Sequence, residues 1–125
     1  GGTRPPRDGY FFAPTLLADV PDDSMAMTVE PFGPLAIARP FSTMDEAVSV
    51  ANSLPMGLAA YAHSTSARRL DDVAAALNVG CIALNNWQVS SAETPFGGVN
   101  DSGYGSEGGL EGLQVYLATK FIHRA

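Results

Sequence analysis

The first residues that could do chemistry are the run 30–34, Glu-Pro-Phe-Gly-Pro, which we call the 30–34 corner. Glu30 stands in an apolar neighbourhood, and a proline on each side of Phe32 restricts the backbone there. The corner would hold a carboxylate and an aromatic ring in a fixed relation, an arrangement suited to gripping a polyol and a flat ring. Local composition alone favours the alternative, a surface glutamate on a turn with Phe32 in the core.

A second candidate lies in a long loop from Asn85 to about Ser106, rich in Ser, Asn, Gly and Pro. Loops longer than about 12 to 15 residues are usually functional or disordered. Trp87 stands near the start of this loop, and the run 94–98, Thr-Pro-Phe-Gly-Gly, adds a glycine pair that permits unusual backbone angles. Local sequence alone favours a packed loop over a binding loop.

The run 103–108 fits the pattern GxGxxG, but its context does not fit a dinucleotide-binding fingerprint. That fingerprint needs a preceding strand, a following helix and an acidic residue about 20 positions further on. Here a loop precedes the pattern and the chain ends before that position. We therefore assign these glycines to turns and to close approaches of the backbone.

Cys81 is the single cysteine, flanked by Gly80 and Ile82 on a predicted buried strand. We expect it to behave as a small hydrophobic residue rather than as a nucleophile. Since His63 and His123 lie far apart in the sequence, no metal-ligand spacing is present and we expect no metal site.

The composition predicts a folded α/β domain without nucleic-acid or membrane partners. The chain has 125 residues, 46% hydrophobic and 16% charged, which is far from the composition of disordered proteins and is the size of one compact unit. A net charge of -6 argues against DNA, RNA or an anionic membrane surface. With one cysteine and neither an apolar run of about 20 residues nor a signal peptide, we expect a cytoplasmic protein.

Alternating strands and helices must position the candidate residues. We expect an extended segment at 11–20, one or two helical turns at 25–30, strands at 35–41, 58–63 and 81–84, and helices at 43–53 and 66–78. Thr43 with Glu46 forms a capping-box pattern, and Ser66 is the expected N-cap of the second helix. Such an alternation is typical of a parallel βαβαβ segment with right-handed connections.

After the long loop the sequence leaves two alternatives open. Leu110, Leu113 and Leu117 have the spacing of a weak helix, although three glycines lie among and before them. The segment 115–123 could alternatively contain a strand.

Taken together, these residues resemble the C-terminal part of the aldehyde dehydrogenase superfamily. The matching motifs, in family order, lie at 9–12, 14–15, 19–20, 30–34, 46–47, 51–52, 57–60, 95–98 and 102–108. Each motif is weak alone, but their order and spacing over essentially the whole chain make the resemblance specific. The run 90–98 is most similar to NAD(P)-dependent succinate-semialdehyde dehydrogenases.

The resemblance implies roles for six residues. In the family, the glutamate of the E-x-F-G-P motif binds the nicotinamide-ribose hydroxyls and the phenylalanine contacts the nicotinamide, so Glu30 and Phe32 become cofactor-binding residues for NAD or NADP. A carboxylate accepts two hydroxyl donors well. The substrate-lining loop contributes Ser90 or Ser91 to a distal carboxylate, Trp87 to an apolar wall of the tunnel, and Phe96 to substrate binding.

The resemblance also implies what this segment does not contribute. The nucleophilic cysteine, the general-base glutamate and the dinucleotide-binding domain of the family lie upstream of the matched segment, so no catalytic residue is assigned here. We interpret residues 1–125 as the C-terminal portion of a catalytic domain that oxidises an aldehyde, such as succinate semialdehyde, to a carboxylic acid. The isolated polypeptide is expected to be inactive.

The partners implied are the aldehyde, the remainder of the enzyme and further copies of it. Family dimers and tetramers use C-terminal strands, and the segment 116–123 would be such an edge, able to pair with another chain. The alternative function is a stand-alone binding or oligomerisation module that kept the α/β scaffold without catalysis.

Overall fold

The computed structural model describes residues 1–125 as two compact units, Gly1–Ser42 (the N-terminal unit) and Thr43–Ala125 (the C-terminal unit). Chain length alone predicts a single unit, so this division is a difference from expectation. None of the helices has the length and apolar character that a membrane crossing requires.

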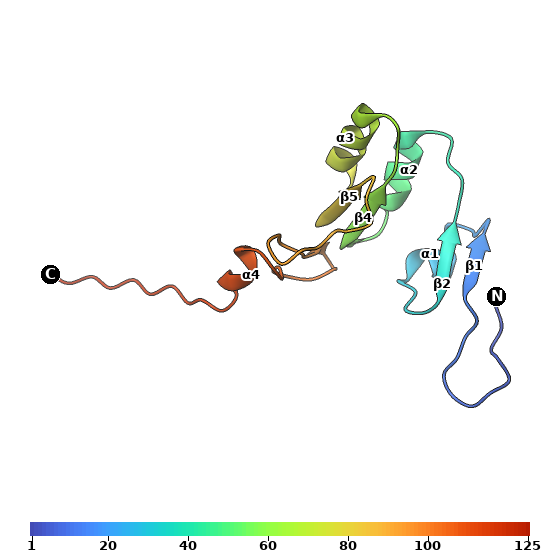
Figure 1. Cartoon of the computed structure of the whole chain (residues 1–125), viewed down its shortest axis with the longest axis horizontal. Helices are drawn as coiled ribbons and strands as arrows, with labels where there is room; N and C mark the ends of the chain where they lie inside the picture. The colour runs from blue at the N-terminus through green and yellow to red at the C-terminus, as the bar shows by residue number, and fades with distance from the viewer. The chain divides into compact units, whose positions relative to one another are not determined.

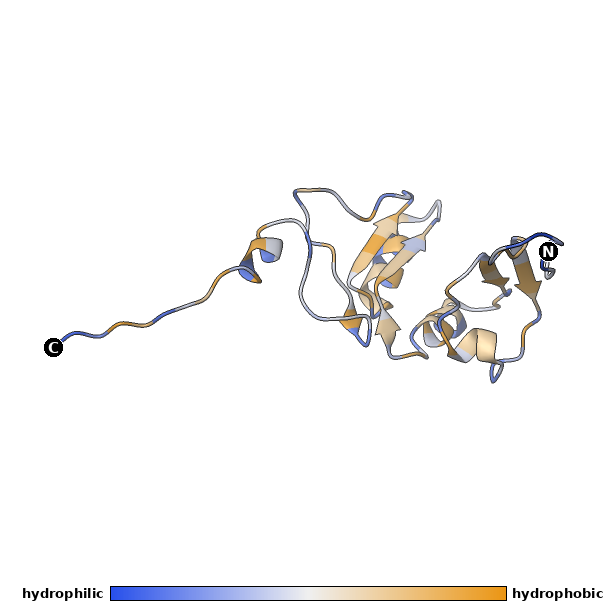
Figure 2. Ribbon diagram, turned by 90° about the horizontal axis from the view of Figure 1, so that it is seen from below, coloured by the Kyte–Doolittle hydropathy of each residue, from blue (hydrophilic) through white to orange (hydrophobic).

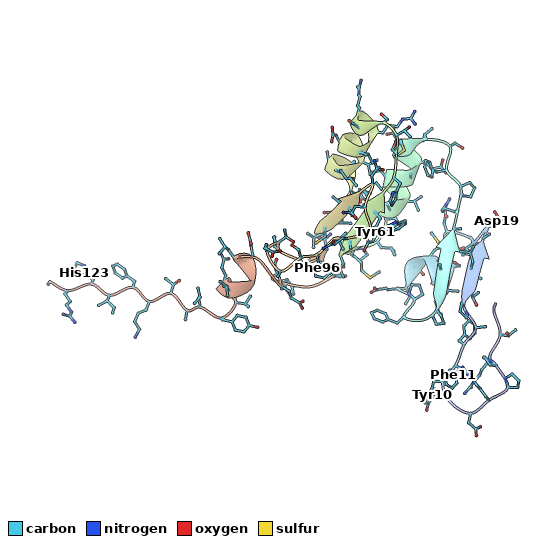
Figure 3. The ribbon with its side chains drawn as sticks, in the orientation of Figure 1. Tyr10, Phe11, Asp19, Tyr61, Phe96 and His123 are labelled. Atoms are coloured by element: carbon cyan, nitrogen blue, oxygen red, sulfur yellow. The ribbon has the colours of Figure 1, made fainter.

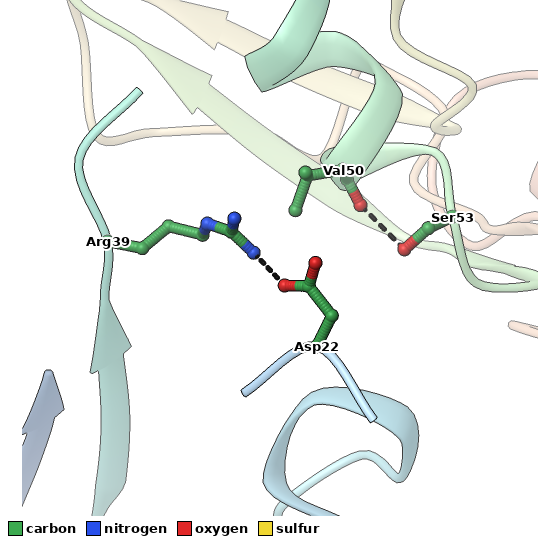
Figure 4. Close-up of polar contacts among 4 residues, drawn as sticks. All are labelled: Asp22, Arg39, Val50 and Ser53. Carbon is green, nitrogen blue, oxygen red and sulfur yellow. Dashed lines mark hydrogen bonds and ion pairs between the residues drawn. The ribbon is translucent and has the colours of Figure 1, made fainter. Parts of the chain in front are cut away.

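The N-terminal unit is a parallel strand pair with one short helix. Strand β1, Thr15–Ala18, pairs in parallel with β2, Leu35–Ala38, and helix α1, Met25–Thr28, lies between them in sequence. An ion pair between Arg39 and Asp22 joins the end of β2 to the turn before α1 (Figure 4). The extended segment and the helical turn are confirmed. Strand β2 is shorter than expected and alternates half-buried with exposed residues, because a two-stranded sheet in a small unit is covered on one face only.

Two helices of the C-terminal unit begin at the capping residues that the sequence predicts. Helix α2, Met44–Ala51, starts where the Thr43 hydroxyl accepts a hydrogen bond from the backbone N–H of Glu46 at 3.2 Å. Helix α3, Ala67–Ala76, starts where the Ser66 hydroxyl accepts from the backbone N–H of Arg69 at 3.4 Å. Each hydroxyl satisfies a donor that the first helical turn leaves unpaired.

The strands of the C-terminal unit form two pairs. Strand β4, Ala59–Ala62, pairs in parallel with β5, Cys81–Leu84, while β3, Met56–Gly57, pairs antiparallel with β6, Val99–Asn100. Helix α3 packs against both α2 and β5 (Figure 1). The α/β class and the parallel pairing are confirmed. The predicted strands do not share one sheet, since β2 pairs with β1 while β4 and β5 form their own pair.

Beyond the long loop the chain forms a short helix and then no regular structure. Helix α4, Glu111–Gln114, is the weak helix that the leucine spacing indicates. Residues 117–125 run on from α4 without helix or strand, so the alternative strand does not form within the chain itself (Figure 1). In the loop, Gly105 and Gly108 adopt φ angles of +79° and +68°, as their interpretation as turn residues requires.

The buried core is small for a chain of this length. Leu70, Cys81 and Ala83 are its buried hydrophobic residues, with 9%, 9% and 4% of their surface exposed. The strands are hydrophobic in character (Figure 2), yet many large hydrophobic side chains are exposed, among them Leu16 at 69%, Met25 at 78% and Leu110 at 77%. Much apolar surface therefore lacks cover within the chain.

The start of β5 should be intolerant of any side chain. A Cβ atom at Gly80 would lie 1.7 Å from the carbonyl oxygen of Gly97, whereas one at Gly33 would meet nothing within 4 Å. We expect Gly80→Ala to lower the free energy of unfolding by about 2 kcal/mol, because two backbone segments must separate. Gly33→Ala should change it by less than about 0.5 kcal/mol. Urea unfolding followed by circular dichroism measures both, and equal stability of the two variants would contradict the close approach.

Candidate cofactor and substrate sites

The 30–34 corner connects α1 to β2 in the N-terminal unit. The backbone N–H of Thr15 donates to the carbonyl of Pro34 at 2.9 Å, and that of Leu35 donates to the carbonyl of Gly33 at 2.8 Å. These bonds tie the end of the corner to the beginning of the β1–β2 pair. The corner is thus held at its end by the sheet, while its remaining side chains face outward.

Glu30 and Phe32 are both exposed, and Phe32 retains 94% of its accessible surface. The structure therefore contradicts the alternative in which Phe32 packs into the core. An exposed carboxylate can accept hydrogen bonds from two vicinal hydroxyls, and an exposed phenyl ring can contact a flat heterocycle. Both side chains are therefore accessible to a ligand.

In the C-terminal unit, the candidate substrate residues follow the end of β5. Because β4 and β5 are parallel, their carboxyl ends meet at the same edge, which is where ligands commonly bind in α/β sheets. The Asn86 side-chain oxygen accepts from the backbone N–H groups of Trp87, at 2.8 Å, and Gln88, at 3.2 Å, and so turns the chain immediately after β5. This turn directs the loop across the edge of the strand pair.

Trp87 joins two aromatic side chains from the end of β4. Its ring centroid lies 4.5 Å from that of His63 and 5.9 Å from that of Tyr61, which Figure 3 labels. We call Tyr61, His63 and Trp87 the aromatic cluster. Trp87 still exposes 75% of its surface, so one side of the indole remains available to a ligand.

The loop after Trp87 lines a cavity of about 400 Å³. Both predicted serines, Ser90 and Ser91, line it. The other lining residues include the polar Asn86, Gln88 and Thr94, and Cys81 of β5. Phe96 lies elsewhere. It is half-buried, its backbone pairs with Glu107, and it lines a second cavity of about 400 Å³ with the glycine-rich segment 103–107 (Figure 3). Ser90 and Ser91 thus line one cavity, Trp87 lies in the aromatic cluster, and Phe96 lines the second cavity.

Cys81 packs as the sequence predicts. It is 9% exposed, and its Sγ lies 3.8 Å from the carbonyl oxygen of Gly97 and 4.0 Å from that of Pro95. These contacts hold the loop against the beginning of β5. The buried Cys81 side chain therefore lines part of the first cavity.

Sequence reasoning missed several residues that shape this region. Gln88 lines the cavity, the His63 ring lies against that of Trp87 with the planes inclined by 39°, and Asn85 binds the main chain of Ser64. One signal was present: Asn85 directly follows the predicted strand at 81–84, and asparagine favours turns and capping there. His63 gave no such signal because its partner is distant in the sequence.

The segment 91–94 forms a compact polar turn. The backbone N–H of Ser91 donates to the Thr94 hydroxyl at 3.2 Å, and the two hydroxyl oxygens lie 3.1 Å apart. The backbone N–H of Glu93 and then the Ser91 hydroxyl stabilise the Glu93 carboxylate and lower its pKa below the usual 4.5. The lowered pKa of Glu93 stabilises the folded state when the pH is above the ordinary pKa of 4.5. This stabilisation is lost as the pH falls through the lowered pKa.

We expect Ser91→Ala to raise the pKa of Glu93 while leaving it below 4.5, because the backbone N–H, the larger cause, remains. Ser90→Ala is the matched control and should leave that pKa unchanged. An NMR titration of the Glu93 side-chain carboxyl carbon measures all three proteins. An identical Glu93 pKa in wild type and Ser91→Ala would contradict the hydroxyl contact.

Residues 1–122 match the sequence profile of the aldehyde dehydrogenase family. The chain is 53% identical over 127 aligned residues to 4-(hydroxymethyl)benzenesulfonate dehydrogenase TsaD1 of Comamonas testosteroni, covering 98% of this chain and 27% of the relative. It is 43% identical to succinate-semialdehyde dehydrogenase of Paenarthrobacter nicotinovorans, again covering 98% of this chain and 27% of the relative.

The fold agrees with a solved structure of an Escherichia coli NADP-dependent enzyme. The TM-score is 0.87 at 39% sequence identity, over 94% of this chain and 24% of that one. The chain spans about a quarter of the length of the curated relatives it matches, 27% for the two named above. Because the profile covers nearly all of the chain and these two relatives are 53% and 43% identical to it over the aligned residues, the protein belongs to the aldehyde dehydrogenase family.

Proposed function

We propose that this chain is the C-terminal portion of the catalytic domain of a dehydrogenase that oxidises an aldehyde to a carboxylic acid with NAD or NADP. The observation that carries the proposal is the 30–34 corner, which presents Glu30 and Phe32 to solvent from a segment held by the β1–β2 pair. Family membership supplies the reaction class. The chain itself supplies positioning groups.

Glu30 and Phe32 are the residues that would hold the nicotinamide end of the cofactor. The Glu30 carboxylate accepts hydrogen bonds from the two ribose hydroxyls, and charge assistance makes such bonds about twice as strong as neutral ones. The Phe32 ring restricts the position of the nicotinamide by contact. When bound, the nicotinamide accepts the hydride that leaves the substrate.

The substrate we propose is an aldehyde with an anionic group at its far end. The names of both relatives describe molecules with an anion at the end opposite the oxidisable carbon. One is a benzenesulfonate with a hydroxymethyl group, a primary alcohol, opposite the sulfonate, and the other is a four-carbon semialdehyde with a carboxylate. The first cavity offers the hydroxyls of Ser90 and Thr94 and the amide of Gln88, which can donate to sulfonate or carboxylate oxygens, and Ser91 lies beside them with its hydroxyl bound to the Glu93 carboxylate. The polar cavity therefore suits the anion, and the aromatic cluster suits the apolar body.

The exposed apolar residues suggest where the rest of the enzyme and a second copy bind. Tyr116, Leu117, Phe121 and Ile122 expose 85%, 74%, 88% and 69% of their surfaces, in a segment without regular structure. An extended segment of this kind can add a strand to the sheet of another copy. We infer a homo-oligomer that uses residues 116–123, and the same surface would serve the alternative of a non-catalytic oligomerisation module.

The 125-residue chain by itself should turn over no aldehyde. Its single thiol, Cys81, is 9% exposed and packs against carbonyl oxygens, whereas covalent aldehyde oxidation needs an accessible thiolate and a base for the deacylating water. Purified chain should produce no NADH or NADPH absorbance at 340 nm with succinate semialdehyde or an aromatic aldehyde. Measurable turnover would overturn this assignment.

In the complete dehydrogenase, Glu30→Gln should slow hydride transfer about tenfold, because an amide accepts ribose hydroxyls less strongly than a carboxylate and about 1.4 kcal/mol corresponds to one decade. Single-turnover formation of reduced cofactor measures this step. Glu111→Gln, which removes the charge of an exposed glutamate on α4, is the matched control and should retain the wild-type rate. Unchanged hydride transfer in Glu30→Gln would remove the proposed role.

A further inference from the structure

A two-bond side-chain clamp, made by Asn85, lies two residues before Trp87, at the carboxyl ends of β4 and β5. The Asn85 side-chain oxygen accepts from the backbone N–H of Ser64 at 2.9 Å, and the Asn85 amide nitrogen donates to the backbone carbonyl of Ser64 at 3.0 Å. One side chain thus binds both polar groups of a single residue on the neighbouring segment. The clamp joins the two strands just beyond their ladder.

The backbone of Asn85 is equally constrained. Its N–H donates to the carbonyl of Ala62 at 2.8 Å and extends the β4–β5 ladder by one bond. Its φ angle is +52°, in the left-handed region that asparagine, aspartate and glycine tolerate better than other residues. The turn made by Asn86 follows immediately. The chain therefore leaves the strand pair in one defined direction.

The clamp lies close in sequence to both members of the closest ring pair in the aromatic cluster, His63 and Trp87. Ser64 directly follows His63, and Asn85 lies two residues before Trp87, whose ring centroid is 4.5 Å from that of the imidazole with the planes inclined by 39°. The Ser64 hydroxyl also accepts from the backbone N–H of Ser66, the N-cap of α3, at 3.1 Å. Ser64 is therefore anchored on one side to a helix and on the other to Asn85.

We propose that Asn85 is a positioning residue for substrate recognition: by clamping Ser64 it holds Trp87 against His63 and presents the exposed indole face to a flat substrate body. This inference rests on the proposed function. The residues on either side of Trp87, Asn86 and Gln88, line the same cavity as Ser90 and Ser91. An aldehyde whose anion reaches the serines would pass the indole, and aromatic rings stack on such a face.

The chain contains a matched control for this clamp. The Asn52 side-chain oxygen accepts from the backbone N–H of Asn78 at 2.9 Å, and its amide nitrogen donates to the carbonyl of Ala76 at 2.8 Å. This second clamp has the same chemistry and joins the ends of α2 and α3. It lies outside the aromatic cluster and the cavity lining. Its loss should affect stability without affecting substrate preference.

The test compares Asn85→Gly with Asn52→Gly in the complete dehydrogenase. The two aldehydes are a benzaldehyde with a carboxylate in the para position and succinate semialdehyde. We expect Asn85→Gly to raise KM for the aromatic aldehyde about fivefold, the loss expected for one net hydrogen bond, with kcat nearly unchanged. KM for succinate semialdehyde should change less than about twofold. Asn52→Gly should leave both KM values as in wild type.

A double-mutant cycle tests whether Asn85 acts through Trp87. In a Trp87→Leu background, Asn85→Gly should have no further effect on KM for the aromatic aldehyde, since the ring that it positions is gone. Additive effects would overturn the inference. If Asn85→Gly fails to fold, Asn85→Asp takes its place, because aspartate tolerates the left-handed backbone and keeps the acceptor while losing the amide donor.

The outcomes separate this inference from the proposed function. A wild-type enzyme that oxidises neither aldehyde with NAD or NADP overturns both. An active wild type in which Asn85→Gly raises both KM values equally, or raises neither, overturns the inference alone. An active wild type with a selective, Trp87-dependent rise in KM for the aromatic aldehyde supports both.

Discussion

The parallel pairing of β4 with β5 is the constraint on which the C-terminal unit depends. Parallel strands end at the same edge, so the residues that follow them meet although they are about twenty positions apart in sequence. That edge holds the aromatic cluster, the Asn85 clamp and the start of the cavity. Gly80 makes the pairing compatible with the loop, since the carbonyl of Gly97 occupies the place of a side chain.

Directional hydrogen bonds specify much of the geometry around a small core. Only a few hydrophobic residues are buried, so much of the organisation comes from hydroxyls at helix starts and from asparagine clamps that join segments. In the N-terminal unit, the Arg39–Asp22 ion pair likewise joins two segments, the end of β2 and the turn before α1 (Figure 4). Polar contacts of this kind specify geometry more than they add stability, since exposed pairs contribute little net free energy.

The two candidate sites lie in different units, and each depends on different features. Glu30 and Phe32, proposed to bind the cofactor, need only a free carboxylate and a free ring, and both side chains are exposed. Ser90 and Ser91, proposed to bind the substrate, line a cavity that depends on the 91–94 turn and on the wall made by β5. A single family motif therefore accounts for the first pair, whereas the second pair depends on packing between segments.

The sequence by itself determined the local features: the N-caps at Thr43 and Ser66, the strand at 81–84, the buried Cys81, and the family through its ordered motifs. These depend on neighbouring residues or on motif order, which a linear pattern contains. Tertiary structure alone decided that β2 pairs with β1, that the backbone of Phe96 pairs with Glu107, and that the His63 ring lies against Trp87. Each of these is a contact between segments separated in the sequence. Backbone pairing selects among many such contacts, and it is nearly independent of side-chain identity, so a linear pattern does not show which contact forms.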